Sequence, residues 1–274
     1  MSELVALGKA GAAIRKANDA GRGALIGYLP AGFPTYDGAV DGVKAMIDGG
    51  ADVIELGLPY SDPVMDGVTI QRATEVALAG GLRTRDVLST VEKIAAYSDV
   101  PVLVMTYWNP IERYGVDRFA TDFAAAGGAG LITPDLIPDE GAEWIAAADK
   151  HDLDKVFLVS PSSTDERIAM TTANCRGFVY ATAVMGVTGA RDKPSDLAAP
   201  LVARVKAATG LPVGVGLGIS NGDQAAGVAA FADAAIVGAA LVKALQDGGP
   251  AGVRKLTEGL AEGVRREPRA TAAR

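Results

Sequence analysis

The chain has 274 residues, of which 49% are hydrophobic and 22% charged, and its formal net charge is -7 at pH 7. This length allows one large α/β domain or two small ones, and the composition is ordinary for a globular protein. The acidic balance and the lack of any lysine and arginine cluster argue against a protein that binds nucleic acid.

Strand and helix signals alternate along the chain, after a first amphipathic helix expected at residues 2–20. Short runs of Val, Ile and Leu with the length of strands occur at 24–29, 52–58, 101–107, 130–133, 155–160, 177–183, 212–216 and 234–238. Alanine-rich segments with helical spacing lie between them, at 36–48, 85–97, 116–126, 139–150, 195–209 and 224–231. A further helical stretch, at 68–79, falls in the longest gap between two strands.

Continuous apolar strands that alternate with helices indicate a parallel sheet covered by those helices. Eight such repeats in about 250 residues fit a closed (β/α)8 barrel better than an open sheet. We therefore predict an α/β fold with one barrel domain over 1–264, a helix before the first strand that covers the bottom of the barrel, and an inserted helix after the second strand. Residues 265–274 are polar and unpatterned, which is typical of a frayed tail.

Two carboxylates, Glu55 and Asp66, are expected at the end of the barrel where active sites lie. Glu55 sits late in the second strand between Ile54 and Leu56, where an ionised side chain is costly unless it is paired or protonated. Asp66 lies in the loop that follows. Burial of Glu55 would raise its pKa and suit it to acid-base chemistry, whereas Asp66 is expected to stay ionised. The alternative is a chance Glu near a strand end and an ordinary loop Asp.

Further polar residues are expected around the same mouth of the barrel. Tyr107, Asn109, Asp135 and Tyr180 stand at or near strand ends, although each one could equally serve packing or a turn. Glycines at 214, 216, 218 and 238 follow the last two strands, where backbone N–H groups and a helix N-terminus commonly bind phosphate. Tight turns would also explain them. The loop at 186–189 is a candidate lid with a further phosphate ligand.

Several kinds of chemistry lack the residues that they need. His151, the only histidine, precedes the fifth strand at the far end of the barrel, and Cys175 is the only cysteine. A histidine-ligated metal, a Ser-His relay, an intrachain disulfide and a cysteine metal cluster are therefore not expected. Neither a lysine at the barrel mouth nor a nucleotide-binding P-loop is present. We expect metal-free acid-base chemistry on a phosphorylated substrate, in a cytoplasmic protein without membrane spans.

The segment from Glu55 to Gly67, with Thr69 to Gln71, strongly resembles the signature of the tryptophan synthase alpha chain family. Segments that match the family's other active-site loops, in the same order and at similar spacing, are 28–34, 105–110, 133–136, 186–189, 216–220 and 236–238. The resemblance covers about residues 4 to 260.

The resemblance implies retro-aldol cleavage of indole-3-glycerol phosphate to indole and glyceraldehyde 3-phosphate. It also implies a tryptophan synthase beta chain as partner, in an alpha2beta2 complex in which pyridoxal phosphate belongs to the beta chain and this chain holds no cofactor. By resemblance, Glu55 shuttles protons, Asp66 accepts the indole N–H, and Tyr180 stands near the catalytic carboxylate.

The resemblance also assigns binding residues. The indole ring would contact Tyr28, Met105, Tyr107, Ile132 and Leu217. The phosphate would contact Thr188, Gly189, Gly218, Gly238 and Ala239. The beta chain would dock on the rim that carries Asp62, Pro63, Asn109 and Asp135. Leu217 departs from a frequent aromatic residue, and Ala239 from a frequent serine.

Three other functions remain open on the sequence alone. The first is a stand-alone lyase that releases free indole without a beta chain. The second is another phosphate-handling barrel enzyme, such as a sugar-phosphate epimerase or isomerase, since one fold supports many reactions. The third is a catalytically silent subunit that regulates a partner, which the retention of Glu55 and Asp66 argues against.

Overall fold

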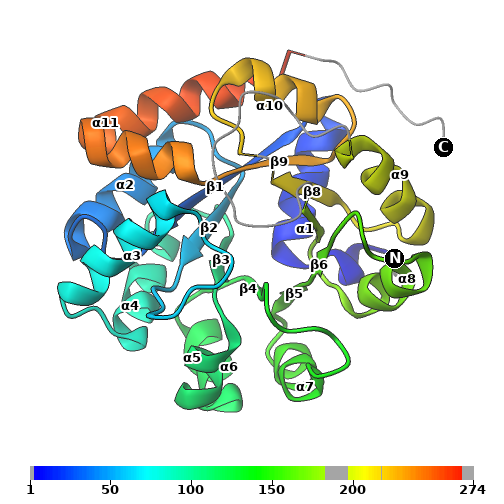
Figure 1. Cartoon of the computed structure of the whole chain (residues 1–274), viewed down its shortest axis with the longest axis horizontal. Coiled ribbons are helices and arrows are strands. Elements are labelled where there is room, and N and C mark those ends of the chain that lie inside the picture. Colours follow the sequence, from blue (N-terminus) through cyan, green and yellow to red (C-terminus); the bar gives the residue numbers. More distant parts are fainter. Residues whose placement is uncertain (1–2, 183–196, 217, 267–274) are drawn as a thin grey trace.

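The computed structural model describes residues 3–182, 197–216 and 218–266, and it is a barrel of parallel strands surrounded by helices (Figure 1). The strands are β1 (Ala24–Pro30), β2 (Val53–Gly57), β3 (Val102–Met105), β4 (Gly130–Ile132), β5 (Asp154–Val156), β6 (Leu158–Val159), β7 (Val179–Thr182), β8 (Val213–Gly216) and β9 (Ala234–Val237). The helices are α1 (Glu3–Asp19), α2 (Tyr36–Asp48), α3 (Val68–Ala79), α4 (Thr84–Ala95), α5 (Trp108–Tyr114), α6 (Val116–Ala125), α7 (Ala142–Lys150), α8 (Asp165–Asn174), α9 (Ala198–Ala208), α10 (Gly222–Ala229) and α11 (Ala239–Gly263). The expected α/β barrel class is confirmed.

The ring closes through a strand that changes partner partway along. The described strands pair in the order β5-β4-β3-β2-β1-β9-β8-β7-β6, and the two outermost, β5 and β6, are consecutive in the chain. Val156 pairs with Ile132 of β4, whereas Leu158 pairs with Tyr180 of β7, so the chain turns at Phe157 from one neighbour to the other. The single strand expected at 155–160 is therefore divided in two, while the eightfold ring is as expected.

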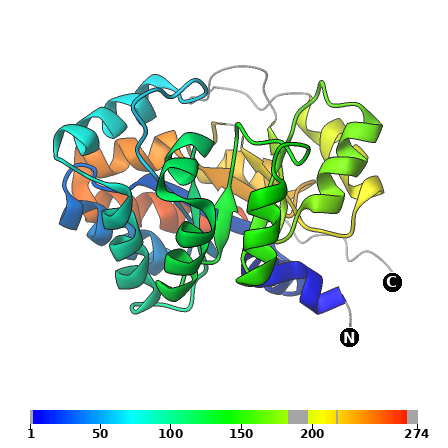
Figure 2. The same ribbon diagram turned by 90° about the horizontal axis from the view of Figure 1, so that it is seen from below.

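The N-terminal helix covers the bottom of the barrel, as expected. Ala10, Ile14 and Ala17 of α1 pack in one buried cluster with inward-facing strand residues such as Ile26 and Val53. The backbone N–H of Ala10 donates to the buried carboxylate of Asp154, 2.8 Å away. Figure 2 shows α1 at the end of the barrel opposite to the segment that joins β2 to α3. Helix α1 therefore closes the end of the barrel that lies away from the β2–α3 segment.

The helix pattern departs from the expectation in two places, at α5 and at α8. The inserted helix between β2 and β3 is confirmed as α3, followed by α4. The expectation did not include α5, whose seven residues contain Pro110, or α8, whose sequence Asp165–Asn174 is mostly polar and has no apolar stripe wide enough to identify it. Residues 195 and 196 of the helix expected at 195–209 and the tail residues 267–274 lie outside the described part of the chain. No helix among the described residues is long and apolar enough to cross a membrane.

Candidate active site

Glu55 points into the barrel and is almost fully buried. Its neighbours Ile54 and Leu56 pack outward with the helices, while Val53 belongs to the inner cluster, so the alternation along β2 turns Glu55 inward. Its exposed fraction is 2%, and within the described chain Oε2 has no hydrogen-bond partner. Loss of solvent, with a smaller effect of the negative charge of Asp66, raises the pKa of Glu55 to about 8. The carboxyl group therefore holds a proton at neutral pH and can donate it.

Asp66 lies above Glu55 at the entry to α3 and is only half-buried. Its backbone carbonyl accepts a hydrogen bond of 2.7 Å from Nε2 of Gln71, which fixes the turn onto the helix. Burial raises the pKa of the Asp66 carboxyl, and a hydrogen bond from Tyr107 lowers it in part. The Asp66 carboxylate is therefore less solvated than one in an exposed loop, while the hydrogen bond from Tyr107 favours its charged form.

Two tyrosines from other strands face the same carboxylates. Tyr28 of β1 is paired in register with Glu55, and Tyr180 lies on β7. Burial, followed by the charges of Asp66 and Glu55, holds the pKa of Tyr28 well above its usual range, and burial and the charge of Glu55 do the same for Tyr180. Both hydroxyl groups therefore stay protonated and can act as donors beside the carboxylates.

Glycines on neighbouring strands make room for these two tyrosines. A Cβ atom at Gly57 would lie 2.3 Å from Oη of Tyr28, and one at Gly216 would lie 2.5 Å from Oη of Tyr180. A Cβ at Gly214 would meet the ring of Phe178 at 3.0 Å. The structure thus gives Gly214 and Gly216 a packing role, whereas the sequence suggested phosphate binding. Sequence reasoning did not identify this need for space, because it depends on the register between strands.

Hydrogen bonds link the loop after β3 to the Asp66 loop and to the loop after β4. Tyr107 accepts a hydrogen bond of 2.9 Å from the backbone N–H of Met65, next to Asp66. Asp135 accepts from the backbone N–H of Trp108 through both carboxylate oxygens, at 2.9 and 3.1 Å, and so caps the start of α5. Tyr107 therefore contacts the Asp66 loop, and Asp135 supports the loop that carries Tyr107.

An apolar wall and a helix N-terminus complete the mouth. Met105 of β3 and Ile132 of β4 are paired in register; Ile132 belongs to the inner cluster, and the partly buried Met105 packs against it. Gly218, with φ of 71°, follows β8 and adopts a backbone conformation that favours glycine. Gly238 is the N-cap of α11 beside the ring of Tyr28, and Ala239 is the first residue of that helix. Thr188, Gly189 and Leu217, together with the predicted lid at 186–189, lie outside the described residues.

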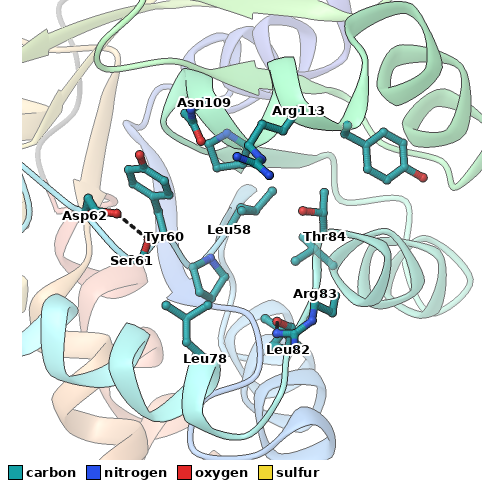
Figure 3. A pocket seen from close by; sticks show the side chains of 14 residues that line it. Leu58, Tyr60, Ser61, Asp62, Leu78, Leu82, Arg83, Thr84, Asn109 and Arg113 are labelled. Atoms are coloured by element: carbon teal, nitrogen blue, oxygen red, sulfur yellow. Dashed lines mark hydrogen bonds between the residues drawn. The ribbon is translucent and has the colours of Figure 1, made fainter.

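A separate groove of about 590 Å³ opens on the outer side of the β2–α3 segment. Figure 3 shows Asn109 and Arg113 of α5 on one side, Leu82 and Arg83 before α4 on the other, and Leu58 between them. Asp62, whose carboxylate accepts a hydrogen bond of 2.6 Å from Ser61, also lines it. Glu55 and Asp66 do not, so the groove belongs to the rim and not to the cluster of carboxylates and tyrosines. Among the described residues no group of three His, Cys, Asp or Glu could hold a metal ion.

Comparison with known proteins identifies the family. The family model for the tryptophan synthase alpha chain matches residues 14–267. The chain belongs to the tryptophan synthase alpha chain family. An alpha chain of Acidothermus cellulolyticus is 58% identical over 261 residues, which cover 94% of this chain and 97% of that protein. An alpha chain of Mycobacterium marinum is 60% identical over 244 residues, or 89% of this chain and 90% of that one.

Solved structures of tryptophan synthase match this chain in fold and over most of its length. A chain from a structure of Mycobacterium tuberculosis tryptophan synthase matches with a TM-score of 0.90 and 55% identity, covering 94% of this chain and 98% of that chain. A chain from a tryptophan synthase complex of Pyrococcus furiosus matches with a TM-score of 0.81 and 32% identity, covering 88% and 98%. This alpha chain is therefore a lyase of tryptophan biosynthesis. The family uses no cofactor, and the pyridoxal phosphate of tryptophan synthase resides in the beta chain.

Proposed function

We propose that Glu55 and Asp66 together carry out the cleavage of indole-3-glycerol phosphate to indole and glyceraldehyde 3-phosphate. The observation that carries this proposal is the buried Glu55 carboxyl, whose pKa is raised to about 8, with a second carboxylate close enough to contribute to the rise. Such a pair supplies a proton donor and a negative charge at neutral pH without a metal ion.

The two groups would divide the chemistry of the retro-aldol step. Glu55 gives its proton to C3 of the indole ring, and Asp66 accepts the ring N–H as positive charge develops on that nitrogen. Glu55, now ionised, takes the proton of the glycerol hydroxyl. The bond between C3 and the glycerol carbon then breaks, its electrons return to the ring, and the hydroxyl carbon becomes the aldehyde. Tyr180 remains protonated beside Glu55 and would steady the carboxylate while it is charged.

Substrate binding would use the two sides of the same mouth. The indole ring would lie against Tyr28, Met105, Tyr107 and Ile132, together with Leu217. The phosphate would lie at Gly218 and at the N-terminus of α11, where Gly238 and Ala239 offer backbone N–H groups and a favourable helix dipole. Thr188 and Gly189 would add to this end of the site.

We also propose that the chain works in the cytoplasm, as the alpha chain of an alpha2beta2 complex with a beta chain that carries pyridoxal phosphate. The matched structures include one described as a tryptophan synthase complex. The docking face would be the rim with Asp62, Pro63, Asn109 and Asp135, of which Asp62, Asn109 and Asp135 are exposed. Because this rim continues into the Asp66 loop, docking would favour the ordered, competent arrangement of that loop.

The test is release of indole from indole-3-glycerol phosphate by the purified chain, with and without a tryptophan synthase beta chain. We expect a weak rate alone and a rate at least tenfold higher in the complex, since about 1.4 kcal/mol of population shift corresponds to a factor of ten. A full rate alone, with no complex detected by sedimentation, would favour a stand-alone lyase. No indole under either condition would contradict the proposed reaction.

A further inference from the structure

Tyr107 lies beside the segment that joins β2 to α3 and carries Asp66. It follows β3, forms the N-cap of α5, and is buried, with 6% of its surface exposed. The resemblance assigns it only to the wall around the indole ring. In the structure, however, Tyr107 contacts the β2–α3 segment directly.

Tyr107 contacts that segment at both of its ends. The ring lies against the ring of Tyr60, with centroids 5.4 Å apart, at the start of the segment. The hydroxyl oxygen accepts the hydrogen bond from the backbone N–H of Met65, at 2.9 Å, at its end. A phenol can accept one hydrogen bond while it donates another, and the Asp66 carboxylate is the group that receives the donated bond. The side chain of Tyr107 therefore contacts the first part of this segment at Tyr60, its last part at Met65, and the carboxylate of Asp66.

We propose that Tyr107 is a positioning residue for Asp66, whose hydroxyl holds the Met65–Asp66 turn so that the carboxylate faces the indole N–H before the beta chain binds. This inference rests on the role proposed above for Asp66. It assigns to the Tyr107 hydroxyl a function that packing against an indole ring does not require, since a phenylalanine would pack there equally well.

The charges around this contact set the direction of its effect on pH dependence. Asp66 on the loop and Asp135 after β4 are the carboxylates that act on Tyr107, and Glu55 of β2 and Tyr28 of β1 face Asp66 from below. Burial raises the pKa of Tyr107 to about 12, so the hydroxyl keeps its proton and remains a donor. Its loss removes a bond to the ionised form of Asp66 and therefore raises the pKa of Asp66.

The experiment compares Tyr107→Phe with Tyr97→Phe. The control removes a similar tyrosine to aspartate hydrogen bond, from Tyr97 to Asp48 at 2.7 Å, between the end of α2 and the residues that follow α4. Cleavage of indole-3-glycerol phosphate is followed from pH 5 to pH 10 with a saturating beta chain, and affinity for a non-cleavable indole alkyl phosphate is measured in parallel. Amide hydrogen exchange of the peptide over 59–67 reports the loop itself in the full chain.

For Tyr107→Phe we expect kcat to fall roughly ten- to a hundredfold, the loss that a misplaced catalytic group causes. Affinity for the analogue should stay within about threefold, because the aromatic ring remains. The acid limb of the pH profile, which reports Asp66, should move to higher pH while the alkaline limb, which reports Glu55, stays in place. Exchange over 59–67 should accelerate. Tyr97→Phe should change none of these.

Each other outcome overturns the inference in a recognisable way. A kcat within twofold of the wild type with an unmoved acid limb means that the hydroxyl does not position Asp66. A loss of analogue affinity equal to the loss of kcat/KM, without a limb shift, means that the hydroxyl contacts the substrate. Asp66→Asn, assayed beside these variants, separates the two proposals: full activity there refutes the catalytic role of Asp66 itself, whereas an inactive Asp66→Asn with a normal Tyr107→Phe refutes only the positioning role.

Discussion

Replacing Glu55 with glutamine is expected to stabilise the folded protein at alkaline pH. The folded chain holds the Glu55 proton more tightly than the unfolded chain does, since burial raises the pKa of this group from its ordinary value of 4.5 to about 8. The free energy of unfolding of the wild type should therefore decrease as pH rises from about 4.5 to about 8, and then level off. Glutamine has the same shape and no proton to lose, so the variant lacks this decrease.

The size of the effect follows from the two pKa values. Each pH unit between them corresponds to about 1.4 kcal/mol, so the variant should gain on the order of 1 kcal/mol over the wild type near pH 5.5 and on the order of 4 kcal/mol near pH 8.5. Asp154, whose pKa burial raises to about 6, titrates in both proteins and cancels in the comparison. A gain in stability that is small at acid pH and large at alkaline pH is the result that a buried carboxyl group predicts.

Urea denaturation at a series of pH values, followed by circular dichroism, measures this difference directly. Glu143→Gln on the exposed face of α7 is the matched control, and its difference from the wild type should stay within about 0.5 kcal/mol at every pH. A difference for Glu55→Gln that is constant from pH 5.5 to pH 8.5, or one that shrinks, would refute the burial of an uncompensated carboxyl group at this position.

Three further predictions concern packing, phosphate binding and the partner. Gly57→Ala should lower the free energy of unfolding by about 1 to 3 kcal/mol, because the new Cβ would lie 2.3 Å from the Tyr28 hydroxyl oxygen. Gly238→Ala should be tolerated, because its Cβ would lie 3.5 Å from the Tyr28 ring, and equal melting temperatures of the two variants would contradict this. Ala239→Ser should lower KM for indole-3-glycerol phosphate roughly two- to tenfold through a new hydrogen bond to phosphate, and an unchanged KM would argue against a phosphate there. Asp62→Ala should reduce stimulation by a beta chain more than the basal rate of indole release, and an equal loss of both would exclude a docking role.

The barrel could be predicted from the sequence because its strands are buried on both faces. Runs such as Val53 to Gly57 read as continuous apolar strands, and their alternation with helices leaves few other folds. The division of one strand at Phe157 was not predicted, since it depends on which neighbours the two halves meet around the ring. Helix α8 was missed because its sequence is mostly polar and its position becomes clear only beside β6 and α9.

The candidate site was predictable in its residue types more than in its contacts. Glu55 is conspicuous because a carboxylate interrupts an apolar strand, and its inward orientation follows from the alternation of side chains. The packing of Gly57 against Tyr28 depends on the register between β1 and β2, which no local pattern encodes. The bond between Met65 and Tyr107 joins residues 42 positions apart, so it too required the fold.

The measurement that tests the account most directly is indole release by Glu55→Gln, with a saturating beta chain at neutral pH, beside the affinity of the variant for a non-cleavable indole alkyl phosphate. Because the amide keeps the shape of the side chain and cannot transfer a proton, we expect turnover to fall by about 100- to 10,000-fold while the affinity stays within a few-fold. Retention of more than a tenth of wild-type turnover, in a variant that still binds the analogue, would show that Glu55 is not the acid-base group of the reaction.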